Sequence, residues 1–373
     1  MRKRLDQVRV GFIGAGRISD LHAIEYQANP NAEIVAIADV DTELAATRAR
    51  LWGCPNARVY SDYRALLDDP RVDAVEILLP HHLHADAAID ALDANKHVSL
   101  QKVMTRTIEE ADRVVARADA SPDLAFKVFE NFIFYPPVMK AKELVDQGAI
   151  GDPLTIRIKS NAGKSRTAWK VPPGAWAWRQ DKAANGGGPI AFDDGHHKFA
   201  LGMHFMGEPE EAHAWIGSTT AADGSWLDAP AMISWRFAGQ RLGVLEIAYS
   251  PDLEIITEHY AQDDRVEITG TRGVIWINRG HGRTVDGPPL TLYADGRTES
   301  LGFPDAELGW QASFVHSVRH FINALRTGEP PALTARQGRD VLRFTLAGQL
   351  SDQLGRAVKV AEVGRGANGR PSP

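Results

Sequence analysis

The segment VRVGFIGAGRIS at residues 8–19 is the feature that most constrains how this chain folds. An apolar run rich in β-branched residues leads directly into a turn that contains Gly14 and Gly16. A strand, a glycine turn and a helix in this order present free backbone N–H groups to a phosphate, and a glycine without a Cβ lets a pyrophosphate approach the backbone. The segment therefore predicts a dinucleotide-binding turn in which Arg17 and Ile18 also contact the cofactor, although such turns can also be plain connections.

A second apolar run, residues 34–38, ends at Asp39. An acidic residue about twenty residues after the glycine turn is the group that binds the adenosine ribose hydroxyls. Asp41 and Glu43 follow, with no arginine or lysine beside them, so a 2′-phosphate would be repelled. This pattern predicts NAD as the cofactor, in preference to NADP.

Strand and helix patterns alternate through the first third of the chain. The expected strands after the first are 34–38, 75–79, 97–100 and 125–129, and the expected helices are 42–51, 63–67, 83–94 and 108–118. Such alternation predicts an α/β fold, with a doubly wound parallel sheet that forms an N-terminal Rossmann domain at residues 1–130. Ligands of such sheets bind at the carboxyl ends of the strands. The further candidate cofactor-binding residues at these ends are Pro80, His84, Gln101, Lys102 and Asn131.

From about residue 136 the pattern changes to longer extended segments. These are 154–160, 231–237, 243–249, 264–269 and 274–278, with expected helices at 138–147, 312–326 and 335–354. They indicate an α+β domain on a large, mostly antiparallel open sheet. We assign residues 131–362 to this domain, for substrate binding and oligomerisation, and expect the Gly-, Pro- and Arg-containing tail 363–373 to be disordered.

The composition excludes several classes of function. Hydrophobic residues make up 44% of the chain, charged residues 24%, and the formal net charge is −6, so bulk affinity for nucleic acid or an anionic membrane is not expected. The single cysteine, Cys54, excludes an internal disulfide and fits a reducing compartment. The basic start MRKRLDQ leads into a glycine-containing strand rather than a signal sequence, and no apolar run is long enough to span a bilayer. These features predict a cytoplasmic protein.

Three side chains are the candidate catalytic residues. Lys102 follows an expected strand at the cofactor edge, where it can hydrogen-bond a substrate hydroxyl or transfer a proton; the alternative is a surface lysine in a loop. Asp193 and His197 are four residues apart and would share one face of a helix, where a carboxylate fixes the tautomer of an imidazole base. Such pairs also occur as capping or surface pairs. Asp194 and His196 would face elsewhere.

The segment 164–179 is unusually rich in basic and tryptophan residues. Aromatic rings stack on sugars, and guanidinium groups hold anions, so the segment predicts a sugar that carries a carboxylate, phosphate or sulfonate. An equally weighted alternative is a structural loop whose tryptophans pack against a neighbouring domain or subunit. The candidate substrate-binding residues are Lys164, Arg166, Trp178, Arg179 and, outside the segment, His196.

The histidines of segments 81–84 and 196–204 raise the question of a metal site. The only cysteine is far away in the sequence and no HExxH spacing occurs, so we expect no metal. His84, which would open a helix, is expected to satisfy a local hydrogen bond.

With these residues in place, the chain resembles the Gfo/Idh/MocA oxidoreductases, the family of glucose–fructose oxidoreductase and inositol dehydrogenase. The resemblance covers nearly the whole chain and rests on GFIGAGRIS, LLPHHLHADAAIDALDANKHVSLQKV, YPPVMKAKELVDQGAIGDP, WRQDKAANGGGPIAFDDGHH, VEITGTRGVIWI and SFVHSVRHFINALRTGEPPALTARQGRDVL. It implies NAD(P)-dependent chemistry at a carbinol of a sugar or polyol, and an open sheet that often mediates homo-oligomers. The family's catalytic lysine, aspartate and histidine fall on Lys102, Asp193 and His197.

The chain departs from the family pattern at three places. Gln101-Lys102-Val103 stands where the family has Glu-Lys-Pro, so a charge beside the lysine is missing. His81 stands where asparagine is usual, and Ile133 stands where many relatives carry arginine. These changes indicate an atypical subgroup, and the sequence leaves open whether the Lys102–Val103 peptide bond is cis or trans.

Three functions follow from these residues. The preferred one is an NAD-dependent oxidoreductase of a sugar-derived substrate, with small-molecule partners only and a dimeric or tetrameric assembly. The alternative is an NAD-dependent glycoside hydrolase that oxidises a sugar transiently, eliminates, adds water and reduces again without net redox change. A nucleotide-sensing binding protein is third, since it would need neither Lys102 nor His197. The sequence does not identify the substrate or the oxidised carbon.

Overall fold

A computed structural model describes residues 4–221 and 223–364 of the chain. It divides into two compact units. The first comprises the described part of Met1–Asn131 together with Pro172–Gly186 and Phe314–Leu342. The second comprises Phe132–Val171, Gly187–Ser313 and the described part of Arg343–Pro373. The expected tail at 363–373 lies outside the described residues except for Val363 and Gly364.

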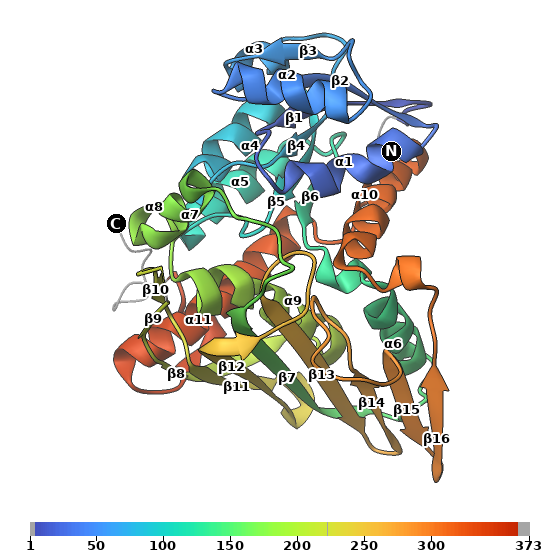
Figure 1. Ribbon diagram of the computed structural model, residues 1–373, viewed down its shortest axis with the longest axis vertical. Helices are drawn as coiled ribbons and strands as arrows, with labels where there is room; N and C mark the ends of the chain where they lie inside the picture. The colour runs from blue at the N-terminus through green and yellow to red at the C-terminus, as the bar shows by residue number, and fades with distance from the viewer. Residues whose placement is uncertain (1–3, 222, 365–373) are drawn as a thin grey trace. The chain divides into compact units, whose positions relative to one another are not determined.

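The first unit is built on a six-stranded parallel sheet with the order β3-β2-β1-β4-β5-β6. The strands are β1 (Val8–Ile13), β2 (Ala32–Ala38), β3 (Arg58–Tyr60), β4 (Ala74–Ile77), β5 (His97–Gln101) and β6 (Phe126–Phe129). The helices between them are α1 (Ser19–Ala28), α2 (Thr42–Leu51), α3 (Tyr63–Leu67), α4 (His84–Asp93) and α5 (Ile108–Asp119) (Figure 1). This order confirms the predicted Rossmann sheet, and its strand order reverses between β1 and β4, where such folds bind their ligand.

The sequence explains why these segments fold as they do. The apolar runs of β1 and β2 are buried on both faces, as in a sheet covered by helices on both sides. Asp41 caps α2 by accepting a hydrogen bond from the backbone of Leu44 at 2.9 Å, and Thr107 caps α5 by accepting from Glu110 at 3.2 Å. Helix boundaries therefore follow local capping signals that are legible in the sequence.

The second unit is built on a nine-stranded sheet with the order β16-β15-β14-β13-β7-β12-β11-β8-β17. All its neighbouring strands are antiparallel except β7 and β12. The strands are β7 (Pro153–Lys164), β8 (Pro209–Ile216), β11 (Ala231–Phe237), β12 (Arg241–Glu254), β13 (Gln262–Gly270), β14 (Gly273–Ile277), β15 (Leu290–Ala294), β16 (Arg297–Leu301) and β17 (Val358–Lys359). This confirms the predicted mostly antiparallel open sheet. The strands β9 (Thr219–Thr220) and β10 (Trp226–Leu227) form a separate pair.

Helices cover one face of this sheet. α6 (Pro136–Asp146) packs on β14, and α9 (Gly195–Met206) packs on β7 and β12 (Figure 1). Along β11 the burial alternates, with Ile233 buried and its neighbour Met232 40% exposed. The alternation is that of a sheet with one face on the core and one face open.

The two units differ from the contiguous boundaries expected at 130 and 362, because distant segments join the N-terminal part. The helices α7 (Pro173–Gln180) and α8 (Lys182–Asn185) belong to the first unit, where Arg106 donates to the carbonyl of Ala183 at 2.8 Å. The helices α10 (Trp310–Thr327) and α11 (Ala335–Leu354) contribute Phe314–Leu342, and Lys127 donates to Ser317 Oγ at 2.7 Å. Such contacts join residues far apart in sequence and leave no local periodicity.

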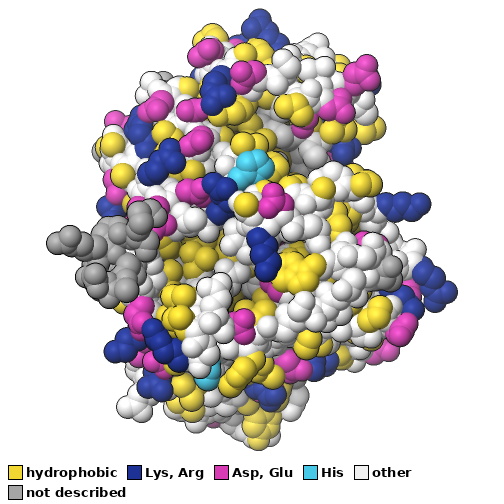
Figure 2. Space-filling view, turned by 90° about the vertical axis from the view of Figure 1, so that its left-hand side faces the viewer, with side chains coloured by type: hydrophobic (Ala, Val, Ile, Leu, Met, Phe, Trp, Pro, Cys, Tyr) yellow, Lys and Arg dark blue, Asp and Glu magenta, His cyan; other side chains and the backbone are white. Residues whose placement is uncertain are grey.

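Charge on the surface is mixed. On the face drawn in Figure 2, Lys and Arg side chains are interspersed with Asp and Glu side chains. Within residues 4–221 and 223–364, no helix has both the length and the apolar character needed to cross a membrane.

Candidate active site

The glycine turn after β1 has the geometry that a dinucleotide requires. Gly14 has a φ of +100°, and a Cβ placed there would lie 2.5 Å from the carbonyl oxygen of Leu78, so only glycine fits. A Cβ at Gly16 would meet no protein atom within 4 Å, so this side of the turn is open. Ser19 Oγ donates to the carbonyl of Gly16 at 2.6 Å and closes the turn onto α1. Arg17 and Ile18 lie half-buried between Gly16 and α1.

Asp39 lies at the carboxyl end of β2, against the same turn. Its Oδ2 accepts a hydrogen bond from the Ala15 backbone at 2.7 Å and its Oδ1 accepts from Asp41 at 2.9 Å. The carboxylate retains lone pairs for ribose hydroxyls. Arg48, which the sequence analysis did not consider, donates to the Ala15 carbonyl at 3.3 Å and pairs with Asp20 at 3.0 Å. The open glycine and the adjacent carboxylate therefore fit the pyrophosphate and adenosine of NAD, and the arginine is already balanced by a carboxylate.

The backbone around Lys102 is held on both sides by side chains of the first unit. The Lys102 N–H donates to Gln101 Oε1 at 2.8 Å. His84 Nδ1 lies 2.8 Å from the Val103 carbonyl oxygen, and its Nε2 lies 2.7 Å from that of Leu79. The Val103 N–H donates to His81 Nε2 at 3.4 Å, and the Lys102–Val103 peptide bond is cis. The loop is thus anchored to the end of β4 as well as to β5.

The histidines of this segment therefore serve as hydrogen-bond partners of the backbone. His81 Nδ1 lies 2.8 Å from the carbonyl oxygen of Asn185, and Nε2 receives the Val103 N–H, which assigns the proton of His81 to Nδ1. Across the described ranges 4–221 and 223–364, no three His, Cys, Asp or Glu side chains converge as metal ligands would. Pro80 lies at the end of β4, and Asn131 is buried after β6.

The basic, tryptophan-rich segment is divided between the two units. In the first, the Arg179 guanidinium lies 4.3 Å from the centre of the Trp178 ring and donates to the carbonyl of Ala175, while Trp178 packs edge-on against His81. In the second, Arg166 Nε lies 3.3 Å from Glu254, and Lys164 Nζ lies 3.6 Å from Asp252. Both of the latter cations therefore face carboxylates of β12.

Asp193 and His197 lie where a π-helical turn, Pro189–Asp194, passes into α9. Both side chains are 4% exposed, and the His197 ring stacks on Phe132 with centroids 4.3 Å apart. The sequence predicted one helix here, and the π-turn is an addition that local spacing does not encode; such turns occur frequently at functional sites. His196 is buried, with Nδ1 at 3.3 Å from Thr345 Oγ1.

Asp228, which the sequence analysis missed, anchors this π-turn. It accepts hydrogen bonds from the backbones of Ile190 at 2.7 Å and Ala191 at 2.9 Å. Burial raises the pKa of the Asp228 carboxyl, and the backbone hydrogen bonds partly oppose this rise. A Cβ at Gly188 would lie 2.0 Å from Asp228, so the glycine lets the carboxylate reach the turn.

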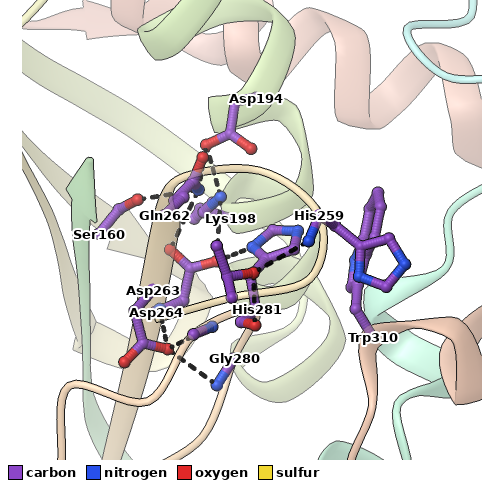
Figure 3. Close-up of polar contacts among 12 residues, drawn as sticks. Ser160, Asp194, Lys198, His259, Gln262, Asp263, Asp264, Gly280, His281 and Trp310 are labelled. Atoms are coloured by element: carbon purple, nitrogen blue, oxygen red, sulfur yellow. Dashed lines mark hydrogen bonds and ion pairs between the residues drawn. The ribbon is translucent and has the colours of Figure 1, made fainter. Parts of the chain in front are cut away.

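A buried ionic network links the start of α9 to β13 (Figure 3). Lys198 Nζ lies 2.6 Å from Asp194 and 3.3 Å from Asp264, and His281 Nδ1 lies 3.5 Å from Asp264. Gln262 donates to Asp194 at 2.7 Å. Burial alone would lower the pKa of Lys198, but the two carboxylates outweigh it and raise the pKa; conversely, Lys198 and His281 hold the pKa of Asp264 low against its burial.

This network fixes the start of α9 to strand β13. Asp194 and Lys198 repeat the spacing of Asp193 and His197 one residue on, which is the signal from which the second pair could have been predicted. Lys198 also lies 5.0 Å from the centre of the Phe132 ring that stacks on His197. Lys198 and His197 therefore contact the same aromatic ring.

Aromatic side chains adjoin the network in the second unit. Trp310 packs against His281 with centroids 4.5 Å apart and against His259 at 5.2 Å (Figure 3). Trp169 lies edge-on to His259 at 4.9 Å. A pocket lined by Phe132, Asp264 and Trp310, among others, opens here. The pocket is small and its lining is predominantly apolar.

Comparisons with known proteins agree over most of the chain. The model of an oxidoreductase family with an NAD-binding Rossmann fold matches residues 8–128, and the model of that family's C-terminal alpha/beta domain matches residues 142–360. The chain is 28% identical over 359 residues to the myo-inositol 2-dehydrogenase of Thermotoga maritima, covering 95% of this chain and 99% of that protein. It is 33% identical over 213 residues to the levoglucosan dehydrogenase of Pseudarthrobacter phenanthrenivorans, covering 55% of this chain and 52% of that one.

Solved structures show the same fold. A levoglucosan dehydrogenase in complex with NADH and levoglucosan has a TM-score of 0.81 at 24% identity and covers 96% of this chain and all (100%) of its own. A probable dehydrogenase from Thermotoga maritima has a TM-score of 0.76 at 26% identity, covering 95% and 100% of the two chains.

The two glycines of the turn are expected to respond differently to alanine. Gly14→Ala introduces a Cβ that clashes with Leu78 at a positive φ, and it should lower the free energy of unfolding by about 1–3 kcal/mol. Gly16→Ala meets no protein atom, so stability should hold while NAD affinity falls by about tenfold or more. Denaturant unfolding and calorimetric NAD titration measure both. Equal NAD affinity in wild type and Gly16→Ala would exclude this turn as the pyrophosphate site.

Proposed function

We propose that this chain, which belongs to the Gfo/Idh/MocA oxidoreductase family, is an NAD-dependent dehydrogenase that oxidises a secondary hydroxyl of a cyclic polyol or sugar. The observation that carries the proposal is the anchored Lys102 loop, which lies in the same parallel-sheet unit as the open glycine turn and Asp39. The named activities of relatives such as the myo-inositol and levoglucosan dehydrogenases support the substrate class.

The proposal gives each candidate residue one role. When bound, NAD supplies the acceptor for the hydride that leaves the carbinol carbon. Lys102 holds the substrate oxygen, and His197 takes the hydroxyl proton as the carbonyl forms. Asp193 orients the imidazole of His197. Stacking on Phe132 at 4.3 Å supports a fixed His197 ring, because a base must keep its nitrogen aimed at one proton.

A neutral polyol is the main substrate proposed. Lys164 and Arg166 face Asp252 and Glu254, so their charges are balanced without an anionic ligand. The narrower proposal of a carboxylate-, phosphate- or sulfonate-bearing sugar therefore rests on the sequence composition of the segment. The relatives cited above are named as dehydrogenases, which favours dehydrogenation over net glycoside hydrolysis.

An activity screen tests the proposed reaction. The purified protein with NAD is expected to oxidise at least one of myo-inositol, scyllo-inositol, levoglucosan, D-xylose and D-glucose, forming one NADH per oxidised product, measured by absorbance and product analysis. D-glucuronate, paired with D-glucose, tests the anionic alternative through a lower KM for the acid. An aryl glucoside with catalytic NAD tests the glycosidase alternative. Release of the aglycone over many turnovers without lasting NADH would assign a glycosidase activity in place of the dehydrogenase activity.

Substitution of the proposed base tests its role. His197→Ala should lower kcat for the fastest substrate of that screen by roughly 10²–10⁴-fold, with NAD affinity retained, because the proton acceptor is lost. Asp193→Asn should cost less, since it disturbs only the orientation of the ring. The exposed His82 provides the matched control, and His82→Ala should retain kcat. Near-normal turnover in His197→Ala would assign proton transfer to another group.

The protein is further proposed to form a homo-oligomer through the open face of the nine-stranded sheet. Trp215 of β8 is 60% exposed, its cross-strand neighbour Met232 is 40% exposed and Leu242 of β12 is 50% exposed. An apolar surface of this kind on a regular sheet favours pairing with a second copy.

Sedimentation velocity tests this assembly. Wild type is expected to sediment as a dimer or tetramer, and Trp215→Arg is expected to shift it toward monomer by placing a charge on the open face. Leu51→Arg, at an equally exposed apolar residue on α2, is the control and should not shift it. A monomeric wild type at micromolar concentration would exclude the proposed interface.

A further inference from the structure

A continuous chain of hydrogen bonds runs from the partly buried Lys102 backbone into the core of the first unit. The Lys102 N–H donates to Gln101 Oε1 at 2.8 Å, and Gln101 Nε2 lies 3.0 Å from His22 Nε2. His22 Nδ1 lies 3.1 Å from Glu76 Oε2, and the Tyr26 hydroxyl donates to Glu76 Oε1 at 2.8 Å. The side chains of His22 and Glu76 are fully buried (0% exposed).

The order of donors and acceptors in this chain is fixed from one end. A backbone N–H can only donate, so the Gln101 atom that faces Lys102 is the oxygen, and the amide nitrogen faces His22. The amide nitrogen can only donate, so His22 Nε2 carries no proton. The remaining proton of a neutral ring is then on Nδ1, where it is donated to the Glu76 carboxylate. The direction of each hydrogen bond in this chain therefore fixes the direction of the next one.

Protonation of His22 on both nitrogens would break this order. Nε2 would then be a donor and would require the Gln101 oxygen, which turns the amide over. The Gln101 NH₂ group would then face the Lys102 N–H, and two donors would oppose each other at the loop. A neutral His22 with its proton on Nδ1 is thus the ring state that leaves Lys102 anchored.

Side chains from α1, β4, β6 and α10 surround the His22 ring. Phe129 of β6 lies against the ring with centroids 3.9 Å apart, and Phe314 of α10 lies edge-on at 5.4 Å. Tyr26 of α1 and Glu76 of β4 are the titratable groups on the Nδ1 side; burial and then Glu76 raise the pKa of the Tyr26 phenol, which keeps it a donor.

Further charged groups lie on or next to the elements around His22. Lys127 of β6 is buried over the Phe129 ring and donates to Ser317 Oγ at 2.7 Å. Burial lowers the pKa of Lys127 to about 7, although Glu76 and Glu130 oppose this. Glu25 of α1 is paired with Arg319 at 2.8 Å. Glu76, named above, is the carboxylate that is in hydrogen-bond contact with His22.

We propose that Gln101, His22 and Glu76 are positioning residues that hold the Lys102 loop through a neutral, Nδ1-protonated His22. The proposed role of Lys102 in the reaction rests on the proposed function, whereas the ring state of His22 does not. In this arrangement the buried negative charge lies at Glu76, two hydrogen bonds behind the residue beside Lys102, and Gln101 transmits orientation without placing a charge next to the lysine.

The ring state is measurable in the intact protein without any substrate. In ¹⁵N-histidine-labelled protein at pH 8, long-range ¹H–¹⁵N spectra should show His22 as the neutral Nδ1–H tautomer. Gln101→Glu places an acceptor on both sides of the ring, so His22 should become doubly protonated at the same pH, where an unperturbed histidine is neutral. A wild-type Nε2–H tautomer or imidazolium, or a His22 that stays neutral in Gln101→Glu, would overturn the proposal.

Assignment uses the signals lost in His22→Gln. If that variant does not fold, Phe129→Leu identifies the ring instead, because removing the aromatic neighbour at 3.9 Å changes the shielding of its protons.

Turnover separates this proposal from the proposed function. Gln101→Met removes both the acceptor for Lys102 and the donor to His22, and kcat for the fastest polyol in the screen should fall by about 10- to 100-fold. Gln101→Glu keeps the acceptor and should lose less. If His22 has the expected tautomer but Gln101→Met does not lower kcat, positioning of Lys102 for the reaction is overturned. If His22 is an imidazolium while Lys102→Ala abolishes turnover, the proposed positioning role of Gln101, His22 and Glu76 is overturned. The dehydrogenase assignment then stands.

Discussion

The parallel pairing of β1 with β2 and β4 is the constraint on which the rest of the first unit depends. Parallel strands end at the same edge, so the turn after β1, Asp39 after β2 and the histidine segment after β4 meet there although they are far apart in sequence. The register also decides the details, because the Leu78 carbonyl of the β4 end lies where a Cβ at Gly14 would be. A shift of one residue in this pairing would remove both the need for glycine and the contact of Asp39 with Ala15.

The second unit depends on the pairing of buried charges. A buried lysine without a partner would be strongly destabilising, and Lys198 is stable as a cation because Asp194 and Asp264 lie within 3.3 Å. Loss of both carboxylates would leave the Lys198 charge uncompensated next to His197 in the chain. These contacts tie α9 to β13 next to the candidate base, through residues that the proposal does not assign to the substrate.

The sequence predicted what is encoded locally. Helix α2 begins and ends at the predicted residues, and Asp41 caps its start. Lys102 directly follows β5, close to the predicted end of that strand. The contacts of His22 with Glu76 and Gln101 join residues 54 and 79 positions apart, and no spacing announces them. The segment 164–179 was treated as one cluster because it is continuous in sequence, whereas its two ends belong to different units.

The amide of Gln101 and the carboxylate of Glu76 together suit the single ring proton of a neutral His22. A carboxylate at both positions would enclose His22 between two acceptors, and the ring would have to carry two protons. With an amide at position 101, one carboxylate is enough, and the ring stays neutral while both of its nitrogens are bonded. The amide presents its oxygen to Lys102, as a carboxylate would, so the loop has its acceptor without a charge beside the lysine. In this chain the negative charge of the network therefore lies on β4, at Glu76, and His22 connects it to Gln101 at the loop.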